Sequence, residues 1–120
     1  MANEISVTVG ASVSNGYLKQ TTATQTRQFT QTTGRAGSTC QDIGTSEETV
    51  SFGDVVPGYV VATNLDTTNF VSLRFVSGGA NAIKLLPNGG QACFHLGASV
   101  TLYAIADTAA CKVKFDAYNT

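Results

Sequence analysis

Short runs of alternating apolar and polar residues recur along this chain and limit what it can fold into. In residues 5–13 an apolar residue stands at every second position, and the same period of two recurs in residues 71–75 and 111–115. Successive side chains of a β-strand point to opposite faces, so this period predicts half-buried strands with one apolar face. No window shows the 3.6-residue period of a helix of ordinary length. The chain is therefore predicted to be all-β.

Turn-forming residues separate these runs at short intervals. Gly, Asn and Pro cluster in residues 14–16, 57–58, 77–79 and 87–90, and all three residue types favour tight turns. Between them, residues 59–65 form a continuous apolar, β-branched run, which is typical of a buried strand. We expect about eight or nine short strands in an antiparallel β-sandwich of jelly-roll type. The strand order stays open.

The other predicted strands and core positions follow from the same patterns. Val50 and Phe52 are predicted to share one face of a strand, and Ile43 is predicted to lie in the core. Residues 34–38, rich in glycine, are predicted to be flexible. The remaining strands are predicted at residues 47–52, 71–75, 83–86, 92–96, 100–106 and 111–118.

The length and the low charge of the chain predict a single domain that contacts another protein. With 120 residues, the chain is expected to form a single β-sandwich domain over residues 1–120. Charged residues make up 12% of it, against about 25% in ordinary soluble domains. Since interspersed charges keep a free domain soluble and monomeric, their scarcity indicates a surface that another protein covers. We expect a homo-oligomer.

A polar segment at residues 20–40 has high β propensity and almost no apolar face. It fits an edge strand, a long exposed loop, or an arm that orders against a partner, and these three alternatives stay open. Together with the first strand, it is the predicted protein interface. The candidate interface residues are Ile5, Val7, Val9, Thr22, Thr24, Thr26, Arg27, Phe29 and Arg35.

The charge distribution argues against nucleic-acid and membrane partners. The net charge is −1, and the seven basic residues are scattered singly, without the basic patch that nucleic-acid binding needs. No apolar stretch approaches the roughly 20 residues of a membrane-spanning helix. The N-terminus lacks the basic and apolar regions of a signal peptide, so we expect synthesis in a reducing cytoplasm.

Cysteine and histidine are too few and too dispersed to predict a metal or thiol site. Cys40, Cys93 and Cys111 are an odd number without CxxC spacing, and buried free thiols are the prediction. His95 shares a strand face with Cys93, but a zinc site needs further ligands. A partly buried His95 and a core Cys93 are the simpler interpretation.

Catalytic motifs are missing from the sequence. It contains no GxSxG, GxxxxGK[ST] or GxGxxG pattern, and most carboxylates fall in turns, where Asp accepts local backbone hydrogen bonds. The pair Glu47-Glu48 is interpreted as a solvated strand start. Most aromatic residues fit core positions, with Tyr17 and Tyr118 the best candidates for exposure. We expect no enzyme activity, no cofactor and no metal.

Three segments resemble a group of small virion structural proteins of tailed bacteriophages. These segments are GYVVATNLDTTNFV at residues 58–71, LLPNGG at residues 85–90 and LYAIADTAACKV at residues 102–113. Similar proteins have an apolar strand that ends in an N-L-D-x-x-N-[FY] turn and an L-Y-A-x-A-x-T-A-A strand and turn near the C-terminus. The resemblance covers roughly the second half of the chain.

The resemblance implies a β-sandwich that sits on or in the virion. It favours a capsid cement, or decoration, protein that binds and stabilises neighbouring major capsid protein subunits, with a homotrimer as the expected oligomer. The alternatives are a tail, baseplate or fibre component, or a lectin-like receptor-binding module. The family supplies no catalytic residues to carry over.

Overall fold

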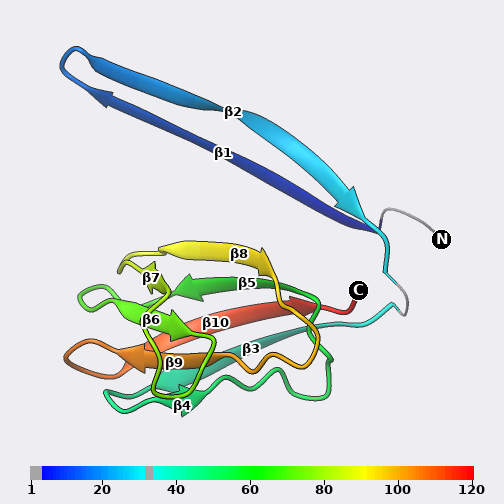
Figure 1. Cartoon of the computed structure of the whole chain (residues 1–120). Coiled ribbons are helices and arrows are strands. Elements are labelled where there is room, and N and C mark those ends of the chain that lie inside the picture. Colours follow the sequence, from blue (N-terminus) through cyan, green and yellow to red (C-terminus); the bar gives the residue numbers. More distant parts are fainter. Residues whose placement is uncertain (1–3, 32–33) are drawn as a thin grey trace. The chain divides into compact units, whose positions relative to one another are not determined.

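The computed structural model describes residues 4–31 and 34–120, and every regular element in these ranges is a β-strand (Figure 1). The predicted all-β class and antiparallel pairing are confirmed, with one or two strands more than expected. The ten strands are β1 (Ile5–Asn15), β2 (Leu18–Phe29), β3 (Ala36–Ile43), β4 (Glu48–Thr49), β5 (Tyr59–Asn64), β6 (Val71–Arg74), β7 (Ile83–Leu85), β8 (Gln91–His95), β9 (Tyr103–Ala106) and β10 (Cys111–Tyr118).

The chain divides into two compact units instead of the single body expected over residues 1–120. Residues 1–33, with residue 120, form the first unit, and residues 34–119 form the second. Among the described residues, the first unit is the β1–β2 hairpin and the second holds the other eight strands. No helix in the described part of the chain is long and apolar enough to cross a membrane.

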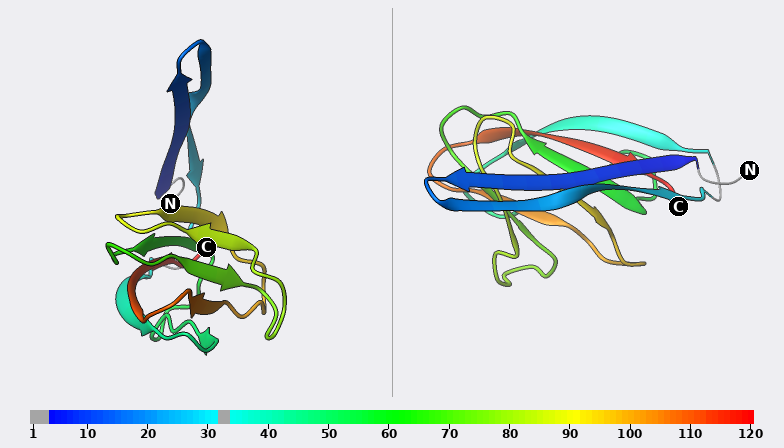
Figure 2. Two further views of the ribbon diagram at one scale, coloured as in Figure 1. Left: turned by 90° about the vertical axis from the view of Figure 1, so that its left-hand side faces the viewer. Right: turned by 90° about the horizontal axis from the view of Figure 1, so that it is seen from above.

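The second unit is a jelly roll of two four-stranded antiparallel sheets. One sheet has the order β3-β10-β5-β8 and the other has the order β4-β9-β6-β7 (Figures 1 and 2). Strands that follow one another along the chain lie in opposite sheets, except for β6 and β7, which pair with each other, as in a double Greek key. This is the strand order of a jelly roll, and it fixes the topology that the sequence left open.

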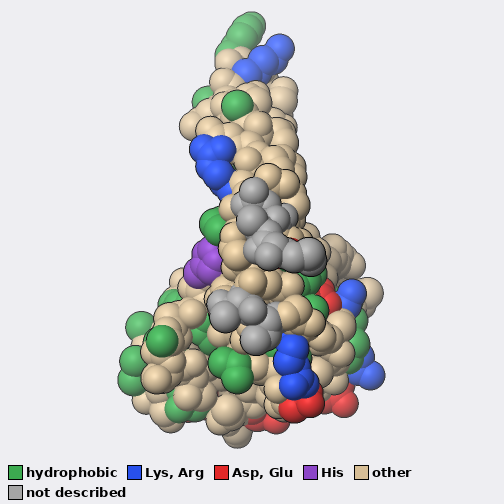
Figure 3. Space-filling model, turned by 90° about the vertical axis from the view of Figure 1, so that its right-hand side faces the viewer, with side chains coloured by type: hydrophobic (Ala, Val, Ile, Leu, Met, Phe, Trp, Pro, Cys, Tyr) green, Lys and Arg blue, Asp and Glu red, His purple; other side chains and the backbone are tan. Residues whose placement is uncertain are grey.

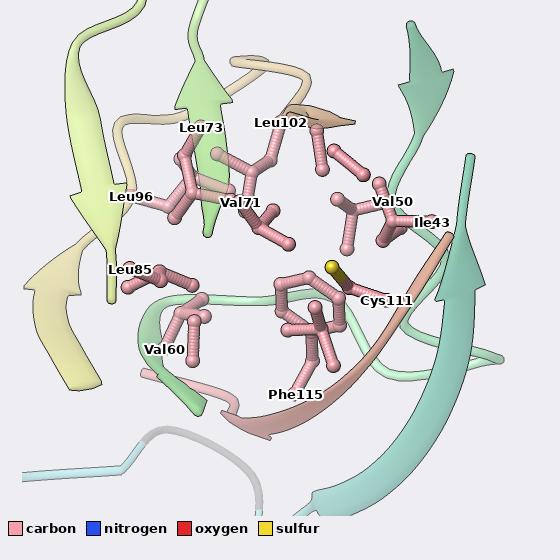
Figure 4. Close-up of a cluster of buried hydrophobic side chains, with 14 residues drawn as sticks. Ile43, Val50, Val60, Val71, Leu73, Leu85, Leu96, Leu102, Cys111 and Phe115 are labelled. Carbon is pink, nitrogen blue, oxygen red and sulfur yellow. The ribbon is translucent and has the colours of Figure 1, made fainter. Parts of the chain in front are cut away.

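A single apolar layer between the two sheets forms the core of the jelly roll (Figure 4). β10 contributes its inward residues Cys111, Val113 and Phe115, and Phe115 also contacts the ring of Phe52 edge-on at 6.1 Å. The other core residues are Ile43, Val50, Val60, Ala62, Val71, Leu73, Leu85, Leu96, Leu102, Ala104 and Ala106.

The buried residues confirm most of the core positions that the alternating pattern predicted. Ile43 is fully buried, and Val50 and Phe52 both face the core as predicted. β5 lies between β10 and β8 in the interior of its sheet, and it is apolar from Tyr59 to Ala62.

Two predicted elements and one predicted core residue differ from the structure. Residues 36–38 belong to β3, where pairing with β10 outweighs the glycine content. The strand expected at residues 47–52 is reduced to β4. Phe75 lies past the end of β6, where it is 37% exposed and contacts Phe94 instead of entering the core.

Asn64 is a buried polar residue that organises the turn after β5. Its Nδ2 group donates to the backbone oxygens of Asn69 at 2.9 Å and Leu85 at 3.0 Å, and its Oδ1 accepts from the Asp66 amide at 2.9 Å. The Asp66 carboxylate then accepts from the amides of Thr68 and Asn69, which lower its pKa. The N-L-D-x-x-N pattern thus encodes a hydrogen-bonded turn that joins both sheets.

Glu47 connects two loops of the jelly roll through hydrogen bonds. It is not the solvated strand start that was predicted. Its carboxylate accepts from Ser77 Oγ at 2.6 Å, the Gly78 amide at 2.9 Å and Arg74 Nη1 at 3.0 Å. Arg74 Nε also donates to Asn81 Oδ1 at 2.7 Å. The hydrogen bonds from Ser77, Gly78 and Arg74 lower the pKa of Glu47.

We expect Asn64→Ala to lower the free energy of unfolding of the jelly roll by about 2–4 kcal/mol, because it leaves the Leu85 carbonyl unpaired in the core. Thr63→Ala is the matched control, since the Thr63 hydroxyl accepts only an exposed hydrogen bond from Gln91. Its expected effect is about 1 kcal/mol or less. Denaturant unfolding measures both variants, and equal losses would contradict the assigned role of Asn64.

We expect the stabilising effect of Glu47 to disappear in acid. Its pKa in the folded chain lies below the ordinary value of 4.5, so its contribution is complete above that pH and is lost as pH falls through the folded value. Glu47→Gln should therefore be less stable than the unmodified chain at pH 7, and the difference should shrink as pH falls from about 6 to about 3. Thermal unfolding across this range tests it. A difference independent of pH would contradict the role of the charge.

Candidate protein-interaction surface

The first unit is a long two-stranded hairpin. β1 pairs antiparallel with β2 over almost their whole length, from Ile5 opposite Phe29 to Asn15 opposite Leu18. The turn between them is Gly16-Tyr17, where Gly16 has a φ of +58° that favours glycine. Tyr17 is fully exposed at the tip, as predicted, whereas Tyr118 in β10 is half-buried.

The alternation in the sequence gives the hairpin an apolar face. Side chains at every second position of β1 point to one side, and the register adds Leu18 of β2 to the same side. We define the apolar face by its apolar residues Val7, Val9, Ala11, Val13 and Leu18; β2 adds Arg27, Gln25, Thr22 and Gln20 to the same side. Val9, Ala11, Val13 and Leu18 are exposed, with Val9 at 55% and Leu18 at 58%.

The exposure of this face corrects the half-buried strand expected at residues 5–13. Ile5 is buried and Val7 is partly buried, but β1 is solvent-exposed from Thr8 to Asn15. The reason is that β1 pairs with β2 alone in a two-stranded sheet, and one sheet layer cannot bury its own face. A shallow depression lined by Ala11, Val13, Gln20 and Thr22 lies on this exposed part.

The opposite side of the hairpin is rich in hydroxyl groups. The Oγ1 atoms of Thr8 and Thr26 lie 2.8 Å apart in a cross-strand hydrogen bond. We define the hydroxyl face by the register as Ser6, Thr8, Ser12, Ser14, Thr21, Thr24 and Thr26.

A bulge interrupts the pairing at Gly10. The register shifts between Val9 and Ala11, so that β2 supplies one residue more than β1 at this point. A Cβ atom at Gly10 would lie 2.6 Å from Thr24 Oγ1 and 3.2 Å from Thr24 Cα, which leaves no room for a side chain. A side chain at this position would therefore force Thr24 to shift.

Few charges lie on the hairpin (Figure 3). On β2, Arg27 is opposite Val7 and donates to Gln25 Oε1 at 3.0 Å. At the other end of the hairpin, Glu4 accepts from the Gln31 amide, and this hydrogen bond lowers the pKa of Glu4.

The structure distributes the predicted interface residues over both faces and over both units. Ile5, Val7, Val9, Thr22, Arg27 and Phe29 lie on the side of the apolar face, whereas Thr24 and Thr26 lie on the hydroxyl face. Arg35 belongs to the second unit, where its Nη2 pairs with Asp54 Oδ2 at 2.7 Å and holds the pKa of Asp54 below its ordinary value.

The predicted interface residues do not include the distal half of the apolar face. Ala11, Val13 and Leu18 continue the row past the bulge. The period of two already included Ala11 and Val13, but Leu18 follows the turn and joins the row only through the hairpin register. For residues 20–29, the structure shows a strand and not a loop, and among the described residues β2 pairs with β1 alone.

The three cysteines lie on different parts of the jelly roll. Cys111 is buried in the core, as predicted, but Cys40 and Cys93 are exposed, which corrects the prediction of buried thiols. Cys40 is on β3 and Cys93 is on β8, at opposite edges of one sheet with β10 and β5 between them. His95 is also exposed, so its predicted partial burial is wrong.

Tyr59, Cys93 and His95 lie together on the outer face of the sheet. Tyr59 is opposite His95 in the register, and their rings meet edge-on at 4.8 Å. Burial, followed by the hydrogen bond and charge of Cys93, raises the pKa of Tyr59 to about 12. Tyr59 is therefore protonated at neutral pH and is suited to packing rather than to proton transfer.

A polar depression on the other sheet contains Arg74, which is already paired with Asn81 and Glu47. Phe70, Ser72, Ile105 and Asp107 line it together with Arg74 and Asn81, which hydrogen-bond to each other. In residues 4–31 and 34–120, no three His, Cys, Asp or Glu side chains lie close enough together to hold a metal ion. The hairpin remains the feature with an exposed, patterned surface.

No protein-family model, curated protein or solved structure matches this chain.

We expect Gly10→Val to loosen the hairpin without destabilising the jelly roll, because the new side chain would overlap Thr24. Hydrogen exchange should be faster for the amides on either side of the bulge and unchanged in β5 and β10. Gly34→Val is the control, since a Cβ there meets nothing within 4 Å. Unchanged exchange in the Gly10 variant would contradict the steric role of glycine.

Proposed function

We propose that this chain is a non-enzymatic structural protein of a larger particle, in which a neighbouring protein covers the β1–β2 hairpin. The observation that carries the proposal is the exposed apolar face of a two-stranded sheet 11 and 12 residues long. An isolated two-stranded hairpin is marginally stable in water, and stability normally requires further strands or a packed layer. A neighbour that covers the apolar face supplies that layer.

The division of the chain into two units supports the same proposal. The jelly roll has its own closed core, to which the hairpin residues do not contribute. That core is therefore complete without the hairpin, so packing of the core does not constrain the residues of the hairpin. An exposed row of valines on a free surface promotes non-specific association, so it favours a dedicated partner.

The resemblance of residues 58–71, 85–90 and 102–113 to tailed-phage virion proteins supplies the context of the proposal. In that context the chain is a capsid cement protein that binds neighbouring major capsid protein subunits. A protein that binds the assembled shell and not the free subunits stabilises the shell by mass action. The same hairpin and jelly roll also fit a tail or baseplate component, and the position of the chain in the particle separates the two.

The proposal predicts that the apolar face is needed for incorporation into the particle. Val9→Thr combined with Val13→Thr keeps the β-branched shape, and therefore the strand propensity, while placing hydroxyl groups in the covered layer. Two such groups without partners cost about 1–3 kcal/mol each, so occupancy at limiting protein concentration should fall at least tenfold.

The measurement uses purified particles separated into heads and tails, with the bound chain quantified by mass spectrometry. Thr8→Ser combined with Thr21→Ser changes the hydroxyl face and is the matched control, with occupancy expected near that of the unmodified chain. Location in heads supports the cement role, and location in tails supports the alternative. Full occupancy by the Val9/Val13 variant would contradict the proposed use of the hairpin, and absence of the chain from every particle fraction would contradict the virion role.

A further inference from the structure

The shallow depression on the outer face of the β4-β9-β6-β7 sheet has a polar floor. Its volume is about 200 Å³, and it is lined by Phe70, Ser72, Arg74, Asn81, Ile105 and Asp107. We call it the Ser72 depression. In the register, Ser72 of β6 is opposite Lys84 of β7 and Ile105 of β9. Its neighbours Val71 and Leu73 point into the core, so the Ser72 side chain points outward into the depression.

Ser72 is nearly buried, yet its hydroxyl group makes no hydrogen bond to any residue that the structure describes. Only 4% of the surface of Ser72 is exposed. Among the same residues, no fully enclosed side-chain nitrogen or oxygen atom lacks a hydrogen-bond partner. Ser72 Oγ is therefore not fully enclosed, and it faces the space of the depression. Because buried polar groups are normally hydrogen-bonded, an unpaired hydroxyl at the floor indicates a ligand site.

An acceptor and a donor lie at opposite ends of the Ser72 depression. At one end, the Asp107 amide donates to the Phe70 backbone oxygen at 3.0 Å. The exposed carboxylate of Asp107 makes no hydrogen bond within the described part of the chain and offers two acceptor oxygens. At the other end, Arg74 Nε donates to Asn81 Oδ1 at 2.7 Å, which orients the Asn81 amide and leaves its Nδ2 group as a donor.

The charges in and around the depression balance. The positive charges are those of Arg74, which pairs with Glu47, and Lys84, whose Nζ lies 4.0 Å from the centre of the Phe70 ring. The negative charges are those of Glu47 and Asp107. An anion would be repelled by the two carboxylates, and a cation would be repelled by Arg74 and Lys84. The site therefore favours an uncharged ligand.

Apolar side chains complete the lining. Phe70 and Ile105 are partly buried, and each leaves apolar surface in the depression. Apolar walls with a few polar groups are the usual composition of a small-molecule site. The volume lies below the roughly 300–1,000 Å³ of sites for drug-sized ligands, so the ligand is about as large as a single ring.

We propose that the Ser72 depression binds one ring of an uncharged carbohydrate. A sugar ring presents apolar C–H groups, which suit Phe70 and Ile105, and hydroxyl groups that both donate and accept hydrogen bonds. Such hydroxyl groups can donate to Asp107, accept from Asn81 Nδ2 and bond Ser72 Oγ at the floor. This inference goes beyond the proposed function, because the site lies on the jelly roll and not on the hairpin.

The shallow form of the site indicates weak binding of a free sugar. A ligand of one ring makes few contacts, so the expected dissociation constant is on the order of 1 mM. Several copies of the chain held close together would bind a polymer of the same sugar more tightly, because the second contact is intramolecular.

The first test is a nuclear magnetic resonance titration of the full-length chain with glucose, galactose, mannose and N-acetylglucosamine, each up to about 50 mM. With at least one sugar, we expect saturable shifts of the Ser72, Asn81 and Asp107 amide signals. Inorganic phosphate and methylammonium are the charged controls. The absence of saturable shifts with all four sugars would overturn the inference. Tighter binding of either charged control at these amides would also overturn it.

The second test is Ser72→Ala. Because the hydroxyl group has no partner in the folded chain, its loss should leave thermal unfolding unchanged and should weaken sugar binding about threefold to tenfold. Ser38→Ala is the matched control, since Ser38 lines a shallow depression on the outer face of the other sheet. Its expected sugar affinity is that of the unmodified chain. Equal affinity in the Ser72 and Ser38 variants would contradict the assigned site.

A third variant tests the rim of the site without touching its floor. Asp107→Asn keeps the size of an exposed side chain that has no partner within the described residues, so the jelly roll should fold as before. The change replaces one acceptor oxygen by a donor, and sugar binding should weaken at least threefold. Undiminished binding by this variant would contradict the role of Asp107 as the acceptor.

The sugar site and the hairpin docking fail in different experiments. The Ser72 depression and the hairpin belong to different units of the chain. A chain that binds no sugar but needs Val9 and Val13 for particle occupancy would refute the sugar site alone. A chain that binds sugar but occupies particles without those valines would refute the docking role alone.

Discussion

The apolar layer between the two four-stranded sheets holds the jelly roll together. Because this layer is complete, the residues outside the jelly roll are not needed for its core. Phe115, Leu73 and Val60 are fully buried in this layer, which closes without a side chain from the hairpin. The hairpin can therefore vary or extend without a loss of core packing. Polar groups secure the ends of the layer: Asn64 joins the two sheets at the turn after β5, and Glu47 joins the loops that flank β4 and β6.

The sheet-forming segments of the jelly roll were largely predictable because one face of each is buried. β10 matches its prediction from Cys111 to Tyr118, and β5 was recognisable from its continuous apolar run. β4 was overestimated, since Val50 and Phe52 face the core from a segment that makes little sheet pairing. The order of the strands depends on pairing between distant segments, and a single sequence carries no direct record of that pairing.

The candidate surface was predictable only in part. The alternation of apolar and polar residues in β1 correctly predicted a strand, but it wrongly implied that the strand is half-buried. Periodicity shows which residues share a face, but not whether another element covers that face. β2 has high β propensity without an apolar row, so the sequence could not decide between strand, loop and arm until the register with β1 was known. The phage resemblance rests partly on Asn64 and Asp66, whose hydrogen bonds give them a structural purpose within the turn. The virion role therefore stays a prediction.

The bulge at Gly10 has a consequence for recognition. A shift of one residue between β1 and β2 would reverse the side on which each side chain lies, and a fixed irregularity in the ladder penalises such a shift. Whenever the two strands pair, the valines therefore stand in one defined arrangement. A ribbon restricted to one register has fewer alternative pairings to lose on association, so less conformational entropy is lost than by a strand pair that can slip.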